Sequence, residues 1–176
     1  MGKRSNFERI PRDFYPTPRE AVLPLLPHLP PEFSYWEPCA GDGALIDHLA
    51  DLAGVTYCAA SDIEPRCAVP KADALSPQPS CRTAVDYIIT NPPWDRKILH
   101  PMIERFSAMR PTWLLFDADW MHTKQSAPFI QWLRKIVSVG RVKWHPDSKH
   151  TGKDNCCWYL FDQKAEGPAQ FFGRAE

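Results

Sequence analysis

The residues best suited to chemistry are Asn91, Pro92, Pro93 and Trp94, which follow an apolar, β-branched run at residues 86–90. Such a run is typical of a strand, whereas an amide, two prolines and an aromatic ring are poor material for a hydrophobic core. The Asn91 side chain and the Pro92 main chain each offer a carbonyl oxygen as a hydrogen-bond acceptor. Because the prolines restrict the backbone, these acceptors are held in place before a ligand arrives. The pattern predicts a rigid binding site at the end of a strand.

A glycine-rich turn at residues 38–43 is the second candidate site. It follows a short strand-like segment and precedes a helix, because Leu45 and Leu49 begin a stripe with helical spacing. Glycines allow a backbone to approach a ligand closely, and the free amide groups of a helix N-terminus suit a carboxylate or phosphate. A Gly-x-Gly pair alone does not identify the ligand, and Ile46 replaces the third glycine of the dinucleotide fingerprint.

Acidic residues follow the next two strand-like segments. Residues 55–63 predict a strand that ends in an acid, Asp62, followed by Ile63. This position is about twenty residues beyond the glycine turn, where α/β nucleotide-binding folds place a carboxylate on ribose hydroxyls. Asp73 follows a third strand-like piece. Either aspartate could instead be an ordinary loop cap.

Together these motifs resemble small phage or bacterial S-adenosylmethionine-dependent amino-methyltransferases, above all those that methylate the exocyclic amine of adenine in DNA. Residues 91–94 are similar to their [N/D/S]PP[Y/F/W] signature, and residues 37–43 read Glu-Pro-x-x-Gly-x-Gly, similar to their motif I. Residues 15–18 resemble an N-terminal motif that helps hold the methionine end of the cofactor. The matches run in the expected order through residues 13–120, most of the chain.

The resemblance implies S-adenosylmethionine as cofactor, with Asp62 on its ribose and Asp73 on its adenine ring. The residues implied to bind the cofactor are Tyr15, Thr17, Pro18, Glu37, Pro38, Cys39, Ala40, Gly41, Gly43, Asp62, Ile63, Asp73 and Asn91. The implied catalytic residues are Asn91, Pro92, Pro93 and Trp94.

An aromatic amine is a poor nucleophile because its nitrogen lone pair is delocalised into the ring. In the implied mechanism, the Asn91 oxygen and the Pro92 carbonyl each accept one amine hydrogen and thereby aim the lone pair at the sulfonium methyl. Trp94 stacks on the target base, which must be flipped out of a duplex. This chemistry needs neither a metal ion nor a covalent nucleophile.

The methyl acceptor is less well specified than the chemistry. Structured RNA, the cytosine amine and a protein glutamine amide are alternatives, although Asn91 at the head of the motif leans toward adenine. A non-enzymatic alternative is a subunit that binds S-adenosylmethionine or nucleic acid and lacks turnover without a partner.

Helices are predicted at three places besides the one after the glycine turn. Thr17, Pro18 and Glu20 form a capping box that starts a short helix. Another helix has an apolar stripe through residues 99–106, with Pro101 in its first turn. The last predicted helix carries Phe129, Trp132, Leu133, Ile136 and Val137.

Later strands are predicted at residues 113–116, 138–144 and 156–161. Strands that alternate with helices predict an α/β fold, with a mostly parallel sheet covered by helices on both faces and ligands at the carboxyl ends of the strands. The resemblance specifies this as the Rossmann-like class I methyltransferase fold. A chain of 176 residues suits one such domain, residues 1–176.

Basic residues cluster locally, although Lys and Arg together number 21 and are balanced by 21 Asp and Glu. Residues 1–20 form a basic N-terminal arm, and residues 134–155 form a second basic segment. A solvated face is the ordinary explanation, and contact with a phosphate backbone is the functional one. The predicted nucleic-acid contacts are Trp94, Arg96, Arg141, Lys143, Lys149 and Lys153.

Only about fifteen residues follow the strand predicted at 156–161, too few for a separate target-recognition domain. We therefore expect DNA methylation with little sequence preference, with a homodimer or partner subunit as an open possibility. The six cysteines form no C-x-x-C pair, which indicates free thiols and a cytoplasmic protein without a metal site. No apolar stretch approaches the length of about 18 residues typical of a membrane span.

Overall fold

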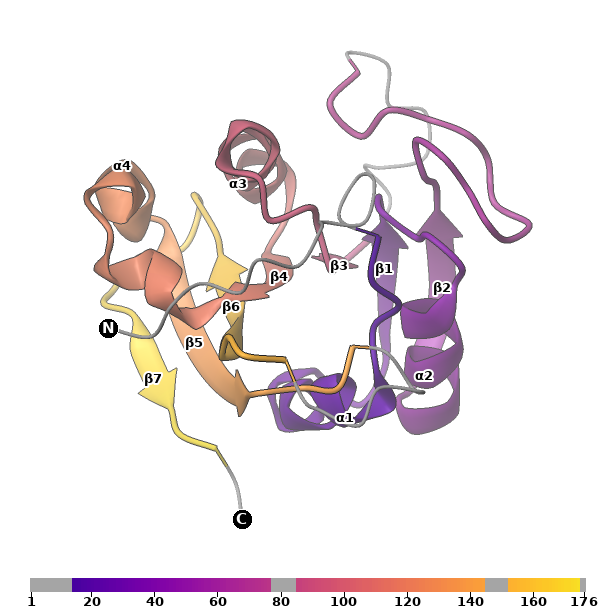
Figure 1. Cartoon of the computed structure of the whole chain (residues 1–176), viewed down its shortest axis with the longest axis horizontal. Helices are drawn as coiled ribbons and strands as arrows, with labels where there is room; N and C mark the ends of the chain where they lie inside the picture. Colours follow the sequence, from indigo (N-terminus) through magenta and orange to yellow (C-terminus); the bar gives the residue numbers. More distant parts are fainter. Residues whose placement is uncertain (1–13, 77–84, 145–151, 175–176) are drawn as a thin grey trace.

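The structure is a computed structural model that describes residues 14–76, 85–144 and 152–174. Its centre is a seven-stranded sheet of order β2-β1-β3-β4-β6-β5-β7 (Figure 1). The strands are β1 Phe33–Glu37, β2 Val55–Ala60, β3 Tyr87–Thr90, β4 Thr112–Asp117, β5 Leu133–Gly140, β6 Cys156–Phe161 and β7 Gln170–Phe172. Strands β2, β1, β3 and β4 pair in parallel, β6 is antiparallel to both β4 and β5, and β7 is parallel to β5. The predicted α/β fold with a mostly parallel sheet is confirmed.

Helices cover both faces of the sheet, as predicted (Figure 1). They are α1 Arg19–Val22, α2 Ala44–Leu52, α3 Arg96–Met109 and α4 Ala127–Ile130, with 3-10 helices η2 Leu23–His28, η3 Ala118–His122 and η4 Lys124–Ser126. Residues of α1, η2 and α2 pack into one hydrophobic core, and residues of α3 and η3 pack into the other. No helix within the described ranges is long and apolar enough to cross a membrane.

Side chains of β4 alternate between the two cores. Leu114 and Phe116 lie in the core beneath α3, while Trp113 and Leu115 lie in the core beneath α1 and α2, and all four are fully buried. A strand buried on both faces reads as a continuous apolar run, which is why the sequence predicted it correctly. The carboxyl ends of β1, β3 and β4 are thereby held firmly in the sheet.

The cysteines among the described residues are all free thiols. Cys156 and Cys157 lie side by side in β6 and point to opposite faces, one into each core, as predicted for neighbours in a strand. Cys81 lies outside the described residues.

The helix predicted through Val137 was wrong beyond Ile130. Leu133 begins β5, in which Ile136 pairs with Tyr159 of β6. Leu133, Ile136 and Val137 match helical spacing as well as a strand buried on both faces. The pairing with β6 decides in favour of the strand, since β-branched side chains pack well on a pleated surface.

Two smaller predictions also need correction. Pro101 lies in the second turn of α3, because Asp95 caps that helix by accepting a hydrogen bond from the Lys97 amide at 3.0 Å. The third strand-like piece forms only an isolated parallel bridge between Asp62 and Lys71. Prolines on either side of that piece restrict its ability to donate to a ladder.

Candidate functional site: a cavity at the strand ends

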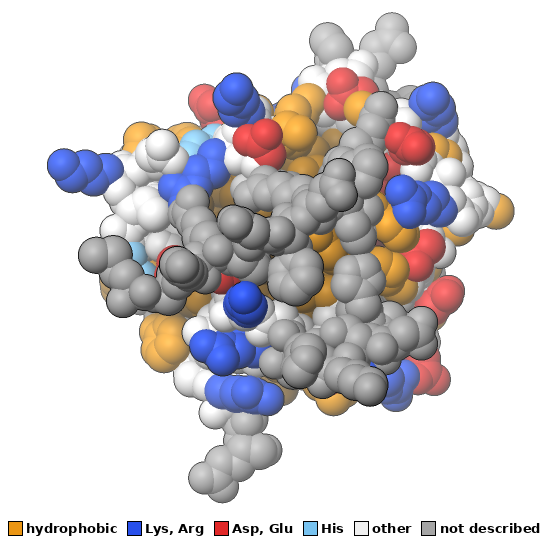
Figure 2. Space-filling view, viewed as in Figure 1, with side chains coloured by type: hydrophobic (Ala, Val, Ile, Leu, Met, Phe, Trp, Pro, Cys, Tyr) orange, Lys and Arg blue, Asp and Glu red, His pale blue; other side chains and the backbone are white. Residues whose placement is uncertain are grey.

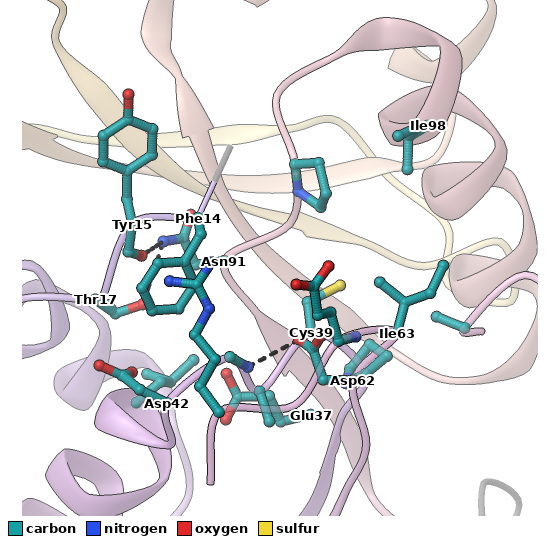
Figure 3. Close-up of a pocket in the computed structure, with 18 of the residues that line it drawn as sticks. Phe14, Tyr15, Thr17, Glu37, Cys39, Asp42, Asp62, Ile63, Asn91 and Ile98 are labelled. Carbon is teal, nitrogen blue, oxygen red and sulfur yellow. Dashed lines mark hydrogen bonds between the residues drawn. The ribbon is translucent and has the colours of Figure 1, made fainter. Parts of the chain in front are cut away.

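A cavity of about 690 Å³ opens where β1, β2 and β3 end. The predicted site residues that line it are Tyr15, Thr17, Glu37, Pro38, Cys39, Ala40, Gly41, Asp62, Ile63, Asp73, Asn91 and Pro93. The predicted site residues outside its lining are Pro18, Gly43, Pro92, Trp94, Arg96, Arg141, Lys143 and Lys153, while Lys149 lies outside the described residues. Segments from positions 15, 37, 62 and 91 therefore meet at one place (Figure 3).

The glycine turn wraps around one wall of this cavity. Gly41 and Gly43 adopt positive φ angles of 55° and 88°, a conformation that side chains other than glycine rarely adopt. A Cβ atom on Gly41 would also come within 2.8 Å of the Phe14 ring. Gly43 occupies the N-cap position of α2, so no side chain caps this helix. The turn thus presents main-chain groups rather than side chains to a ligand.

Asp62 fixes the glycine turn to the loop after β2. Asp62 is buried, with 9% of the residue exposed, and its carboxylate accepts hydrogen bonds from the Gly41 amide at 2.8 Å and the Glu64 amide at 2.6 Å. Each carboxylate oxygen has a further lone pair for a ligand hydroxyl. Asp73 similarly accepts from the Leu75 amide at 2.8 Å while lining the cavity. The ligand roles predicted for the two aspartates stay predictions.

Asn91 is oriented by the segment that precedes α1. Its Nδ2 group donates to the main-chain oxygen of Tyr15 and to the hydroxyl oxygen of Thr17, both at 3.2 Å (Figure 3). Since the amide nitrogen is engaged on that side, Oδ1 is left as the acceptor at the cavity wall. The amine-binding role predicted for Asn91 stays a prediction.

The capping box predicted at Thr17 was wrong. Pro18 occupies the N-cap position of α1, which has no side-chain cap hydrogen bond. The 5% exposed Thr17 side chain instead accepts from Asn91, and Glu20 accepts from the Lys143 amide at 2.8 Å. Tertiary partners 74 and 123 residues away thus replace the local ones.

Glu37 is the most unusual group of the cavity wall. The residue is 1% exposed, and its Oε2 atom has no hydrogen-bond partner within the described residues. Burial raises its pKa well above the ordinary value of 4.5, and the nearby charges of Asp62 and Asp42 raise that pKa further. A buried carboxyl without a partner is costly, so this geometry calls for a cationic or hydrogen-donating ligand.

The opposite part of the cavity is apolar and was largely missed by the sequence interpretation. Ile63 and Ile98 are 47% and 37% exposed, and both line the cavity with Leu75 and Met102 (Figure 3). Exposed branched side chains of this kind suit a flat aromatic ligand ring. Ile98 belongs to the first turn of α3 but lies outside the apolar stripe of that helix, which is the signal that could have identified it.

Trp94 is partly buried and lies outside the cavity lining. Its ring meets Trp144 edge to face, with centroids 5.7 Å apart and an interplanar angle of 83°. The Trp144 ring also contacts Tyr15, with centroids 6.1 Å apart. Trp144 therefore links the two segments that flank Asn91. Stacking of Trp94 on a base stays a prediction.

We expect replacement of Trp144 by alanine to destabilise the protein by about 1 to 3 kcal/mol, because two aromatic pairs worth about 0.5 to 1.5 kcal/mol each are lost. The Tyr15 main chain should also be less firmly held against Asn91. Thermal unfolding measures the loss of stability. Trp144→Phe is the matched control, and equal stability of the alanine and phenylalanine variants would contradict the expectation.

The predicted nucleic-acid contacts fall in different places. Figure 2 shows Lys and Arg side chains gathered where β5 ends and β6 begins, the region of Arg141, Lys143 and Lys153. Arg96, by contrast, donates to the side-chain oxygens of Thr123 and Gln125 at 3.2 and 2.7 Å, which ties α3 to η4. The N-terminal arm before residue 14 lies outside the described residues.

Within the described ranges, no group of three or more His, Cys, Asp and Glu side chains is arranged to hold a metal ion. The sequence matches no protein-family model and has no significant match to a curated protein.

Several solved structures share this architecture. A dimethyladenosine transferase from Plasmodium falciparum matches with a TM-score of 0.55 at 13% identity over 86% of this chain. A putative RNA methyltransferase from Pyrococcus horikoshii matches with a TM-score of 0.59 at 18% identity, covering 89% of this chain and 91% of that one. The fold is that of class I S-adenosylmethionine-dependent methyltransferases.

A chain of a type I restriction-modification system also has this class I fold, with a TM-score of 0.58 at 13% identity over 96% of the present chain. The present chain spans 63% of the dimethyladenosine transferase chain and 46% of the restriction-modification chain. The TM-scores establish a common fold, and the position of the cavity at the strand ends agrees with where such folds bind ligands.

Proposed function

We propose that this protein transfers a methyl group from S-adenosylmethionine to the exocyclic amine of adenine in DNA. The observation that carries the proposal is the orientation of Asn91, whose amide nitrogen is held by Tyr15 and Thr17 so that Oδ1 is left as an acceptor at the cavity wall. An acceptor fixed in this way is ready to bind one hydrogen of an incoming amine.

The cavity residues fit the proposed cofactor. The unpartnered carboxyl oxygen of Glu37 suits an ammonium group such as that of the cofactor's methionyl part. Asp62 and Asp73 suit ribose and adenine groups, and Ile63 and Ile98 suit the faces of the adenine ring. When bound, S-adenosylmethionine supplies an electrophilic methyl group on its sulfonium.

Asn91 and Pro92 hold the acceptor amine in this proposal. The Asn91 Oδ1 atom accepts one amine hydrogen. The Pro92 carbonyl is the second acceptor that the resemblance implies, and it belongs to a buried residue outside the cavity lining. Two acceptors favour a pyramidal nitrogen whose lone pair points at the methyl group. The new bond joins nitrogen to the methyl carbon as the carbon–sulfur bond breaks. The surplus amine proton then leaves to solvent.

Nucleic acid is the proposed substrate class for two reasons. Basic residues gather at the end of β5, where they suit a phosphate backbone (Figure 2). Among the structures of similar fold, the dimethyladenosine transferase supports adenosine as the methyl acceptor, and the restriction-modification chain supports DNA. The putative RNA methyltransferase supports RNA as the second candidate substrate.

Incubation with labelled S-adenosylmethionine and unmodified DNA or RNA tests the proposal. We expect label in N6-methyladenine of DNA, spread over many adenine contexts when the products are sequenced. Label confined to RNA, cytosine or protein would replace the proposed substrate, and strict methylation of one long site would contradict the expected lack of sequence preference. Cofactor binding without any transfer would favour the partner-subunit alternative.

A further inference from the structure

Arg66 and Phe14 form a stacked pair over the glycine turn. The guanidinium carbon of Arg66 lies 3.5 Å from the centroid of the Phe14 ring. At that distance the planar guanidinium must lie flat on the ring, so its N–H donors point sideways rather than into the ring. The Arg66 amide also donates to the Gly41 carbonyl at 2.8 Å, which holds the pair against the turn.

The ionisable side chains that line the cavity around Arg66 are mostly acidic. The acidic lining residues are Glu37, Asp42, Asp62, Glu64, Asp73 and Asp95. Arg66 is the single Lys or Arg among the described residues of the lining. Such a cavity attracts cationic ligands and offers an anionic ligand group one charged partner. No ion pair between Arg66 and a carboxylate occurs within the described ranges.

We propose that Arg66 binds the α-carboxylate of the cofactor's methionyl group. This inference rests on the proposed function, in which Glu37 receives the α-ammonium group. Ammonium and carboxylate are attached to the same carbon, so a ligand that reaches Glu37 must place its carboxylate nearby. Gly41 connects the two sites, because its amide binds Asp62 beside Glu37 and its carbonyl binds the Arg66 amide.

Phe14 prepares the guanidinium for this role. Its ring lies against Gly41, where a Cβ atom would approach it to 2.8 Å, and it supports one face of the guanidinium. A guanidinium held in one plane matches the two oxygens of a carboxylate, with less side-chain freedom to lose on binding. Phe14 is therefore a positioning residue, and Arg66 is the residue that touches the ligand.

Comparison of S-adenosylmethionine with decarboxylated S-adenosylmethionine tests the assignment directly. The second ligand keeps the sulfonium, the ammonium and the adenosine but lacks the carboxylate. By calorimetry the native protein is expected to bind S-adenosylmethionine about 10- to 100-fold more tightly, the range for a charged hydrogen-bonded pair. Arg66→Gln should lose this preference by weakening binding of S-adenosylmethionine alone.

Two further variants sharpen the test. Arg66→Lys keeps the charge without the planar fork and should retain only part of the preference. Arg174→Gln, which removes an exposed guanidinium beside Gly140, is the matched control and should leave the preference unchanged. Retained binding of the decarboxylated ligand shows that the Arg66 variants are folded.

The outcomes separate this inference from the proposed function. If the native protein binds neither ligand, the proposed function fails and the inference fails with it. If the native protein binds S-adenosylmethionine and Arg66→Gln keeps the full preference over the decarboxylated ligand, the Arg66 assignment alone is overturned. Weakened DNA binding with unchanged cofactor preference would likewise overturn it and assign Arg66 to phosphate contact.

Discussion

Replacement of Asn91 by alanine is expected to lower methyl transfer to DNA by at least about 100-fold, the loss typical of removing one preorganised polar group from a reacting centre. The amide oxygen is the acceptor that the proposed mechanism requires, and alanine offers no substitute. Binding of S-adenosylmethionine should persist, because the glycine turn, Glu37 and Asp62 are unchanged. Single-turnover transfer of labelled methyl groups and calorimetric cofactor binding measure the two quantities.

Gln170→Ala is the matched control for Asn91→Ala. Gln170 is an exposed amide residue in the edge strand β7, outside the cavity lining. The control should transfer methyl groups at the native rate. Equal transfer by the Asn91 and Gln170 variants would refute the assigned mechanism.

Replacement of Glu37 by glutamine is expected to have opposite effects on stability and on cofactor binding. In the free protein, the folded-state pKa of Glu37 is raised above 4.5 by burial and by the neighbouring acids. Its stabilising contribution is fully present below pH 4.5 and is lost as pH rises through the folded-state pKa. At neutral pH the variant should therefore be more stable than the native protein, by about 1 to 3 kcal/mol.

Cofactor binding should respond to pH through the same carboxyl. An ammonium group favours ionised Glu37, so binding releases a proton when the free carboxyl is protonated. Affinity for S-adenosylmethionine should therefore rise with pH until the raised pKa of the free Glu37 carboxyl is passed. Glu37→Gln should bind more weakly and lose this dependence.

Thermal unfolding without ligand and calorimetry over a pH series measure the two effects of Glu37→Gln. A stability gain of 1 kcal/mol corresponds to about 2 to 4 °C for a chain of this size. Asp51→Asn is the matched control, because Asp51 is an exposed carboxylate that pairs with Arg19 away from the cavity. A variant that binds with native affinity and native pH dependence would exclude Glu37 as the ammonium partner.

Local sequence pattern was sufficient where the spacing of apolar residues and their burial favour the same kind of element. Leu45 and Leu49 lie on the buried side of α2, and residues 113–116 are buried on both faces, as expected. Ile136 shows where local pattern fails, because its spacing fits a helix and a strand equally well. Only the neighbouring strand β6, distant in sequence, decides between them.

The candidate site likewise contains residues that local sequence pattern predicted and residues that it did not. Positions 37, 41, 62 and 91 were predicted to converge, because strand ends in such a sheet meet at one edge. Thr17 was assigned to a helix cap, since its partner Asn91 lies 74 residues away and no local pattern reveals that contact. Arg66 carried no local signal at all, because its role depends on stacking against Phe14 from another segment.

The contact between the N-terminal segment and β6 affects the order in which parts of the site form during synthesis. The Trp158 indole in β6 donates to the main-chain oxygen of Ala21 at 2.7 Å, across 137 residues of sequence. During synthesis, Tyr15 leaves the ribosome early but lacks this docking surface until β6 exists and has paired between β4 and β5. A nascent chain that ends before Trp158 contains the glycine turn and Asn91, but the Asn91 side-chain amide is not yet held by Tyr15. Competence for methyl transfer should therefore arise in one late step of synthesis rather than grow with chain length.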